Sequence, residues 1–92
     1  MKVKNFNGNR SSDHYRDIGM PEWRNYKGCT NNPKCSALGC NEEGSEGSHV
    51  YKVDSLDSSW YICPFCHEHN ESPDEIELKA DWHSRLVPLT SL

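Results

Sequence analysis

The chain has 92 residues, of which 34% are hydrophobic and 26% charged, and its mean hydropathy is −0.92. This length allows one small domain whose apolar core alone gives marginal stability, so disulfides or a structural metal are expected to contribute. No run of residues is long and apolar enough for a membrane span, and the start of the sequence lacks the apolar segment of a secretory signal. We therefore expect a cytoplasmic protein whose five cysteines stay reduced, with most of them binding metal together with histidine and at least one left over.

Charge is distributed unevenly along the chain. Residues 1–34 carry seven Lys and Arg against three Asp and Glu, a net charge of +4, whereas residues 35–92 carry three against eleven, a net charge of −8. The overall charge of −4 argues against tight non-specific binding of nucleic acid, although a local basic patch can still contact phosphate. We predict a basic N-terminal arm, residues 1–34, followed by a metal-binding domain, residues 35–92. The arm is a candidate contact for a protein or nucleic-acid partner, and ordinary surface charge is the alternative.

The arm shows little hydrophobic pattern. Residues 1–12 are polar and without periodicity, which predicts a loosely structured segment. A short helix is predicted over residues 12–19, and a second one over residues 21–28, where a proline precedes the helical turn and a glycine ends it. Trp23 and Tyr26, three residues apart, are expected on one face of this second helix.

Two extended segments follow a region, residues 29–47, that is rich in turn-forming residues. The sequence HVYKV at 49–53 alternates as a strand does, and WYIC at 60–63 is a second strand, so we predict a hairpin with an irregular turn. Pro64 is expected to end the second strand, and a helix of one or two turns is expected to begin near Cys66.

The C-terminal part is predicted to be short and extended, in EIELKA and in RLVPL. Its apolar side chains are expected to close the core. These side chains are Ile76, Leu78, Leu86, Val87 and Leu89.

The cysteines of CSALGC are spaced as ligands of one metal ion. Cys35 and Cys40 are separated by four residues, and zinc is commonly bound by two ligands at such a spacing in one tight turn. Gly39 allows the backbone to bend before the second thiol. Cys29 lies outside this pair, and we interpret it as a free thiol or a packing residue.

The second ligand pair is ambiguous from spacing alone. Cys63 with Cys66 forms C-x2-C, and Cys66 with His69 forms C-x2-H. The second option is favoured because Cys63 continues a strand and can fill a core position, whereas Cys66 and His69 point the same way from the first turn of a helix. We therefore predict one structural Zn²⁺, with Cys63 as the alternative to the histidine. The predicted ligands are Cys35, Cys40, Cys66 and His69.

The motifs CSALGC, GSHV and WYICPFCHEHN together resemble those of the small zinc-bound HNH-like proteins of bacteria and phages, over residues 35–70. The resemblance implies a small α+β, metal-stabilised fold of the treble-clef type, in which a zinc knuckle, a β-hairpin and a short helix surround one metal. It places the structural ligands at Cys35, Cys40, Cys66 and His69, in agreement with the spacing.

The same resemblance raises the possibility of nuclease activity. In HNH nucleases a histidine on the first hairpin strand activates a water while a divalent ion such as Mg²⁺ stabilises the developing charge. The resemblance places His49 at the position of this general base and Asn70 at that of the final histidine. Ser48 stands where an Asp or His usually helps to bind the catalytic ion, and a neutral hydroxyl is a weak ligand for it. We therefore expect a structural role for His49, whose ring would hydrogen-bond backbone at the base of the hairpin and pack beside the zinc site.

These observations favour a zinc-binding module that acts by binding a macromolecular partner without catalysis. Large aromatic side chains can anchor a protein interface or stack on bases. An acidic body with a basic arm suits a protein partner better than DNA. The alternative is a metal-dependent HNH-type endonuclease with His49 as the general base. The candidate anchors are Trp23, Tyr26, Trp60 and Trp82.

Overall fold

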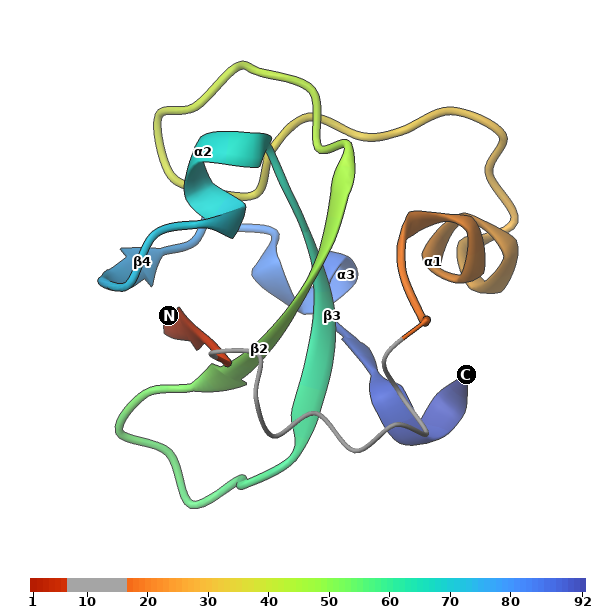
Figure 1. Cartoon of the computed structure of the whole chain (residues 1–92). Helices are drawn as coiled ribbons and strands as arrows, with labels where there is room; N and C mark the ends of the chain where they lie inside the picture. Colours follow the sequence, from red (N-terminus) through yellow and green to blue (C-terminus); the bar gives the residue numbers. More distant parts are fainter. Residues whose placement is uncertain (7–16) are drawn as a thin grey trace.

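The computed structural model describes residues 1–6 and 17–92. Within these residues, five short strands form one antiparallel sheet in the order β4-β1-β2-β3-β5, accompanied by three short helices and a 3₁₀ turn (Figure 1). In this part of the chain, no helix has the length and apolar character needed to cross a membrane. The predicted small α+β class is therefore confirmed.

The centre of the sheet is the predicted hairpin. Strand β2 spans Glu46–Lys52 and β3 spans Trp60–Phe65, and the register pairs His49 with Ile62. Because neighbouring residues on a strand point to opposite faces, Ile62 and Cys63 belong to different sides of the sheet. Both are completely buried, so β3 contributes to the core on both faces.

The expectation that Pro64 ends β3 is wrong, because the strand continues to Phe65. Strand β5, Val87–Pro88, pairs with β3 only at Tyr61 and Ile62, so it does not reach the proline. A proline is tolerated where no neighbouring strand needs its missing N–H. The carbonyl of Pro64 still accepts a hydrogen bond from the backbone N–H of Ser36 at 2.9 Å.

The expectation of a loose start is wrong for the first residues. Lys2–Asn5 form strand β1, which pairs with β2 on one side and with β4, Glu75–Glu77, on the other. Val3 is completely buried and Asn5 is 7% exposed, so the two inward positions of β1 join the interior. The pairing partners lie more than 40 residues away, and the short alternation in KVKN does not by itself identify a strand. The helix expected over 12–19 falls mainly outside the described residues.

The second predicted helix is confirmed as α1, Met20–Lys27. The N–H of Gly19 donates to the Glu22 carboxylate at 2.7 Å, and Gly28 ends the helix in the left-handed conformation with φ of 71°. Trp23 is buried, whereas Tyr26 is 53% exposed, so only one of the two aromatics faces the sheet.

Three short elements complete the chain. Helix α2, His67–Asn70, begins where predicted. Along the chain, α3, Trp82–Arg85, precedes β5, and the 3₁₀ turn η1, Leu89–Ser91, follows it. The extended character expected for EIELKA is confirmed in β4, and that expected for RLVPL is confirmed only in the two residues of β5. Its first residue, Arg85, belongs to α3, which was not predicted, and its last, Leu89, belongs to η1. A single turn of four residues is too short to show helical periodicity.

The interior consists of two clusters that lie on opposite faces of the sheet. One cluster contains Cys35, with Cys40 packed against it, together with side chains of β1, β3 and β4. The other lies under α1. Helix α1 lies on one side of the hairpin, and α2 and β4 lie on the other (Figure 1). All five C-terminal apolar residues predicted for the core are buried. The α1 cluster comprises Met20, Trp23, Ile62, Val87 and Leu89.

Candidate metal centre

The Cys35–Cys40 segment is a tight knuckle held by backbone hydrogen bonds. The N–H of Cys35 donates to the Glu42 carbonyl at 2.8 Å, and the N–H of Cys40 donates to the Ala37 carbonyl at 3.0 Å. Gly39 has a φ of 81°, a conformation that side chains disfavour, and this allows the chain to turn back before Cys40. The predicted role of this glycine is therefore confirmed.

The second pair of ligands is presented by the start of α2. Cys66 is the N-cap residue and His69 follows three residues later, so both side chains lie on the same side of the first turn. The N–H of Asn70 donates to the Cys66 carbonyl at 2.9 Å and closes this turn. Because β3 runs directly into Cys66, the sheet fixes the position of the pair relative to the knuckle.

The two pairs converge on one point. The four ligand atoms of Cys35, Cys40, Cys66 and His69 all lie within 4.8 Å of one another. His69 Nδ1 is 3.1 Å from Cys66 Sγ and 3.6 Å from Cys35 Sγ, and the sulfurs of Cys40 and Cys66 are 4.0 Å apart. Zn–S and Zn–N bonds of about 2.3 and 2.0 Å place the ligands of a tetrahedral site with three sulfurs and one nitrogen about 3.5 to 3.8 Å apart. The cluster therefore has the size of a metal site, and the four predicted residues lie close enough to hold one ion.

Cys63 lies outside this group of ligand atoms. It is completely buried on β3, and burial raises the pKa of its thiol to about 12. The Ser36 hydroxyl contacts the thiol and opposes part of this shift. Burial also raises the pKa of Cys35, to about 11, although hydrogen bonds from the backbone of Ala37 and Cys66 oppose it. A divalent ion in the cluster would replace the proton of Cys35, whereas the thiol of Cys63 has no such neighbour.

The sequence did not reveal the residues that support the cluster from other elements. The Asn5 amide of β1 donates to the carbonyls of His69 and Ser72 at 2.8 and 2.9 Å and so ties α2 to the sheet. Lys79 donates to the backbone of both knuckle cysteines. The only local signal for Asn5 was the alternation in KVKN, which is too short to distinguish a strand from a polar tail.

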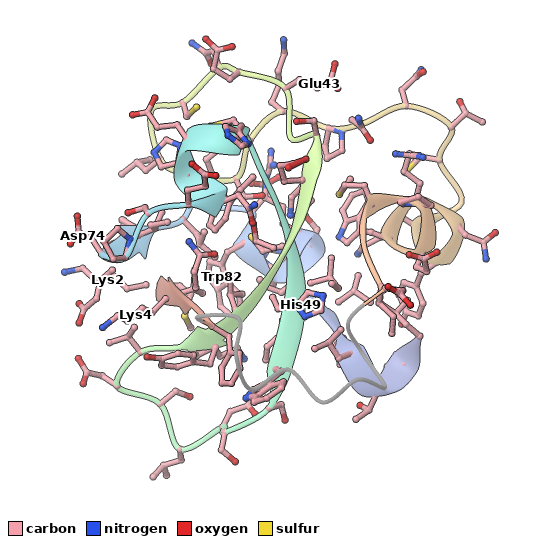
Figure 2. All side chains as sticks on the ribbon, in the orientation of Figure 1. Lys2, Lys4, Glu43, His49, Asp74 and Trp82 are labelled. Atoms are coloured by element: carbon pink, nitrogen blue, oxygen red, sulfur yellow. The ribbon has the colours of Figure 1, made fainter. Side chains whose placement is uncertain are left out.

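The candidate catalytic residues have other partners. His49 Nε2 donates to the carbonyl of Ile18 at 2.7 Å, so the backbone hydrogen bond of its structural interpretation is confirmed. The expected packing beside the zinc site is wrong, because His49 pairs with Ile62 on the face of the sheet that α1 covers, opposite the cysteines. Figure 2 shows the His49 ring on the side of the sheet where α1 lies. The Ser48 hydroxyl donates to Oδ1 of Asn70 at 2.5 Å, from the opposite face of β2. Among the described residues, no hydrogen bond joins His49 to Asn70.

The environment of the cluster is acidic. An open cavity beside Cys66 is lined by Glu42, Glu43 and Glu68, and Figure 2 shows Glu43 at the end of the molecule that carries the knuckle and α2. Negative charges at this end repel phosphate groups.

Two further cysteine and histidine side chains of the described residues, those of Cys29 and His83, do not belong to the four-residue cluster. Cys29 is an exposed free cysteine, and His83 is exposed on α3, as predicted. His14 lies outside the described residues. Comparisons of the chain with protein-family models, with curated proteins and with solved structures find no match.

Proposed function

We propose that the chain is a zinc-stabilised module of the HNH-like, treble-clef type that binds a protein partner without catalysis. The observation that carries this proposal is the convergence of three cysteines and one histidine within 4.8 Å. Four protein ligands complete a tetrahedron and leave no position open for a water or substrate, which is characteristic of structural zinc sites.

The ligand chemistry supports zinc among the divalent metals. Thiolate and imidazole ligands in a compact tetrahedral arrangement suit zinc, whereas magnesium and calcium prefer oxygen ligands. The order of elements supports the treble clef: the knuckle at Cys35–Cys40 precedes the β2–β3 hairpin, and α2 follows the hairpin and supplies the other pair. In a chain with so small a core, binding of zinc is coupled to folding.

The surroundings of His49 support a non-catalytic role. A general base needs a ring nitrogen directed at the attacking water, and a hard divalent ion needs charged oxygen ligands nearby. His49 Nε2 is engaged by the Ile18 carbonyl, and the neighbouring Ser48 is 2% exposed and bonded to Asn70. This arrangement holds α1 and α2 against the hairpin, which is a structural use of the three residues.

The surface charge supports a protein as the partner. The acidic cavity beside the cluster disfavours nucleic acid at that end of the molecule. At the other side, Tyr26 is 53% exposed on α1 and is followed by the exposed Lys27. Tyrosine is enriched in the buried centre of protein interfaces, and a charged side chain such as that of Lys27 suits the polar, solvent-accessible rim.

The proposal is tested in two steps on the full chain. Metal analysis should give one zinc per chain, and a strong chelator should unfold the protein, as measured by circular dichroism. A plasmid-nicking assay with magnesium, manganese or nickel, with His49→Ala as the control, should show no cleavage above background. Metal-dependent cleavage that His49→Ala abolishes contradicts the non-catalytic role.

The partner is tested by photo-crosslinking from position 26, with the exposed His83 on α3 as the control position. We expect a discrete protein adduct from position 26 alone. An adduct with nucleic acid at position 26 contradicts the choice of a protein partner.

A further inference from the structure

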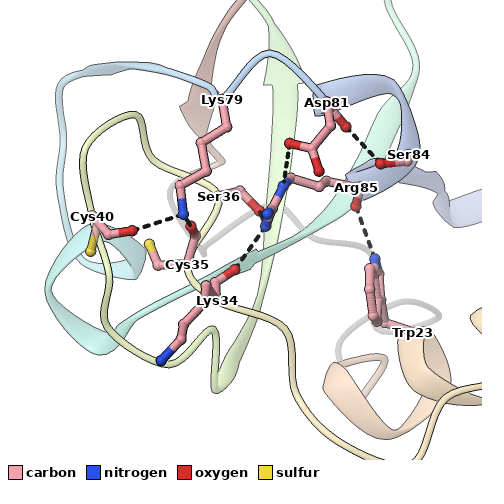
Figure 3. A network of polar contacts seen from close by, with 9 residues as sticks. All are labelled: Trp23, Lys34, Cys35, Ser36, Cys40, Lys79, Asp81, Ser84 and Arg85. Atoms are coloured by element: carbon pink, nitrogen blue, oxygen red, sulfur yellow. Dashed lines mark hydrogen bonds and ion pairs between the residues drawn. The ribbon is translucent and has the colours of Figure 1, made fainter.

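A lysine from the segment after β4 reaches the backbone of the knuckle. Lys79 Nζ donates to the carbonyl of Cys35 at 2.7 Å and to the carbonyl of Cys40 at 2.8 Å, and its own N–H donates to the Ser36 carbonyl at 3.0 Å (Figure 3). One side chain therefore joins the peptide groups of both knuckle ligands. The separation along the sequence, 44 residues from Cys35 and 39 from Cys40, means that this contact exists only in the folded chain.

We propose that Lys79 is a positioning residue of the metal centre, which fixes the two knuckle cysteines and compensates the charge of the metal complex. This inference rests on the proposed binding of zinc by the four-residue cluster.

The proposed ligand set gives the metal complex a negative charge. Three thiolates, a neutral imidazole and a divalent cation carry a net charge of −1. Cys35 is completely buried and Cys66 is 7% exposed, so solvent screens this charge poorly. The ammonium group of Lys79 brings one positive charge to the carbonyls of two of the ligands, and its hydrogen bonds are of the stronger, charge-assisted kind.

The hydrogen bonds of Lys79 also fix the geometry of the knuckle. The carbonyls of Cys35 and Cys40 converge on a single ammonium group, and this holds the ends of the knuckle at a fixed separation. Residues that orient metal ligands in this way typically contribute a factor of about 10 to 100 in metal affinity.

A second cation near the knuckle has a different role. Arg85 donates to the Lys34 carbonyl at 2.8 Å and to the Ser36 hydroxyl at 3.3 Å, and its charge is paired with Asp81 at 2.8 Å (Figure 3). These contacts touch the neighbours of Cys35 and not the carbonyl of a ligand. Arg85 therefore connects α3 to the knuckle, whereas Lys79 acts on the ligands themselves.

The test compares the wild-type chain with Lys79→Met and Lys79→Arg, and uses Lys52→Met as the matched control. Lys52 is also a largely covered lysine, with 16% of its side chain exposed, but it lies over the rings of Tyr61 and Trp82 and pairs with Asp57 at 3.1 Å. Its removal perturbs the fold without touching the knuckle. For each chain, the zinc dissociation constant is measured by competition with a chromophoric chelator, and the free energy of unfolding is measured with zinc in excess.

The absorption bands of the Co²⁺-substituted protein give a further readout, because they report the geometry of the ligands and not overall stability. We expect Lys79→Met to raise the zinc dissociation constant about 10- to 100-fold and to shift the Co²⁺ bands. Lys79→Arg keeps the charge and the donors, so we expect bands of wild-type shape. Lys52→Met should leave the Co²⁺ bands unchanged and weaken zinc binding only as far as its loss of folding stability requires.

The outcomes separate this inference from the proposal on which it rests. If the wild type binds one zinc and Lys79→Met has the same affinity and the same Co²⁺ bands, the role of Lys79 is refuted and the metal centre stands. If the wild type binds no stoichiometric metal, both the proposed zinc site and the role of Lys79 are refuted. Should Lys79→Met fail to fold in excess zinc, Lys79→Gln, which keeps a hydrogen-bond donor but carries no charge, takes its place: weaker zinc binding with shifted Co²⁺ bands supports the role, and wild-type affinity with wild-type bands overturns it.

Discussion

Replacing Cys66 by serine should remove much of the stability of the protein, whereas the same change at Cys63 should be tolerated. Cys66 Sγ lies 3.1 Å from His69 Nδ1 and 4.0 Å from Cys40 Sγ, so the substitution removes one of four ligands from the centre of the cluster. Structural zinc contributes about 10 to 16 kcal/mol of apparent binding free energy at neutral pH, and one thiolate accounts for about 2.5 to 4 kcal/mol of it if the four ligands share it evenly. Small domains have a total stability of about 5 to 15 kcal/mol, so this loss is severe.

The cost at Cys63 is of another kind. Cys63→Ser buries a hydroxyl in place of a thiol, which costs about 1 to 3 kcal/mol when the hydroxyl has no partner. The Ser36 hydroxyl already contacts the Cys63 thiol and can bond the new oxygen, which places the expected loss near the lower bound. Urea denaturation followed by tryptophan fluorescence, with equimolar zinc, measures both variants. A larger loss for Cys63→Ser than for Cys66→Ser refutes the assignment of the ligands.

Three further substitutions test the packing and the charges. Trp23→Phe removes the indole N–H that donates to the Arg85 carbonyl at 2.9 Å, and it should lower the free energy of unfolding by about 1 kcal/mol in urea denaturation. Ile62→Ala leaves a cavity at a completely buried position under α1 and should lower the free energy of unfolding by about 2 to 5 kcal/mol in the same assay. A loss smaller than that of Trp23→Phe contradicts a core with one cluster on each face of the sheet. A hydrogen bond from the Arg85 side chain lowers the pKa of Asp81 in the folded protein. The Asp81 carboxylate therefore stabilises the fold at pH values above its ordinary, unfolded-state pKa, and this stabilisation is lost as the pH falls through the lower pKa of the folded state. In denaturation at pH values from 6 down to 3, the stability difference between the wild type and Asp81→Asn should therefore shrink toward acid pH, and a difference that grows contradicts the pairing.

The grouping of the four candidate ligands could be predicted because its information is local. The spacing of Cys35 and Cys40 and that of Cys66 and His69 each specify a turn that can bind one ion, and the predicted hairpin between them brings the two turns together. The choice of His69 over Cys63 followed from the alternation of side chains along β3, which directs Cys63 into the core.

The supporting contacts could not be predicted because they depend on distant partners. Strand β1 is recognisable only through its pairing with β2 and β4, and its Asn5 reaches α2 across 64 residues of sequence. Lys79 lies in a segment predicted from its apolar residues, and nothing in its neighbours indicates that its ammonium group binds the knuckle carbonyls. The continuation of β3 through Pro64 depends on where β5 stops, which is also a property of the assembled sheet.

The central claim is that one zinc ion is held by Cys35, Cys40, Cys66 and His69, and X-ray absorption at the zinc edge tests it most directly. We predict three sulfur ligands at about 2.3 Å and one nitrogen ligand at about 2.0 to 2.1 Å, in a chain that contains one zinc. Four sulfur ligands would show that Cys63 replaces His69, and oxygen-rich or absent coordination would contradict the metal centre altogether.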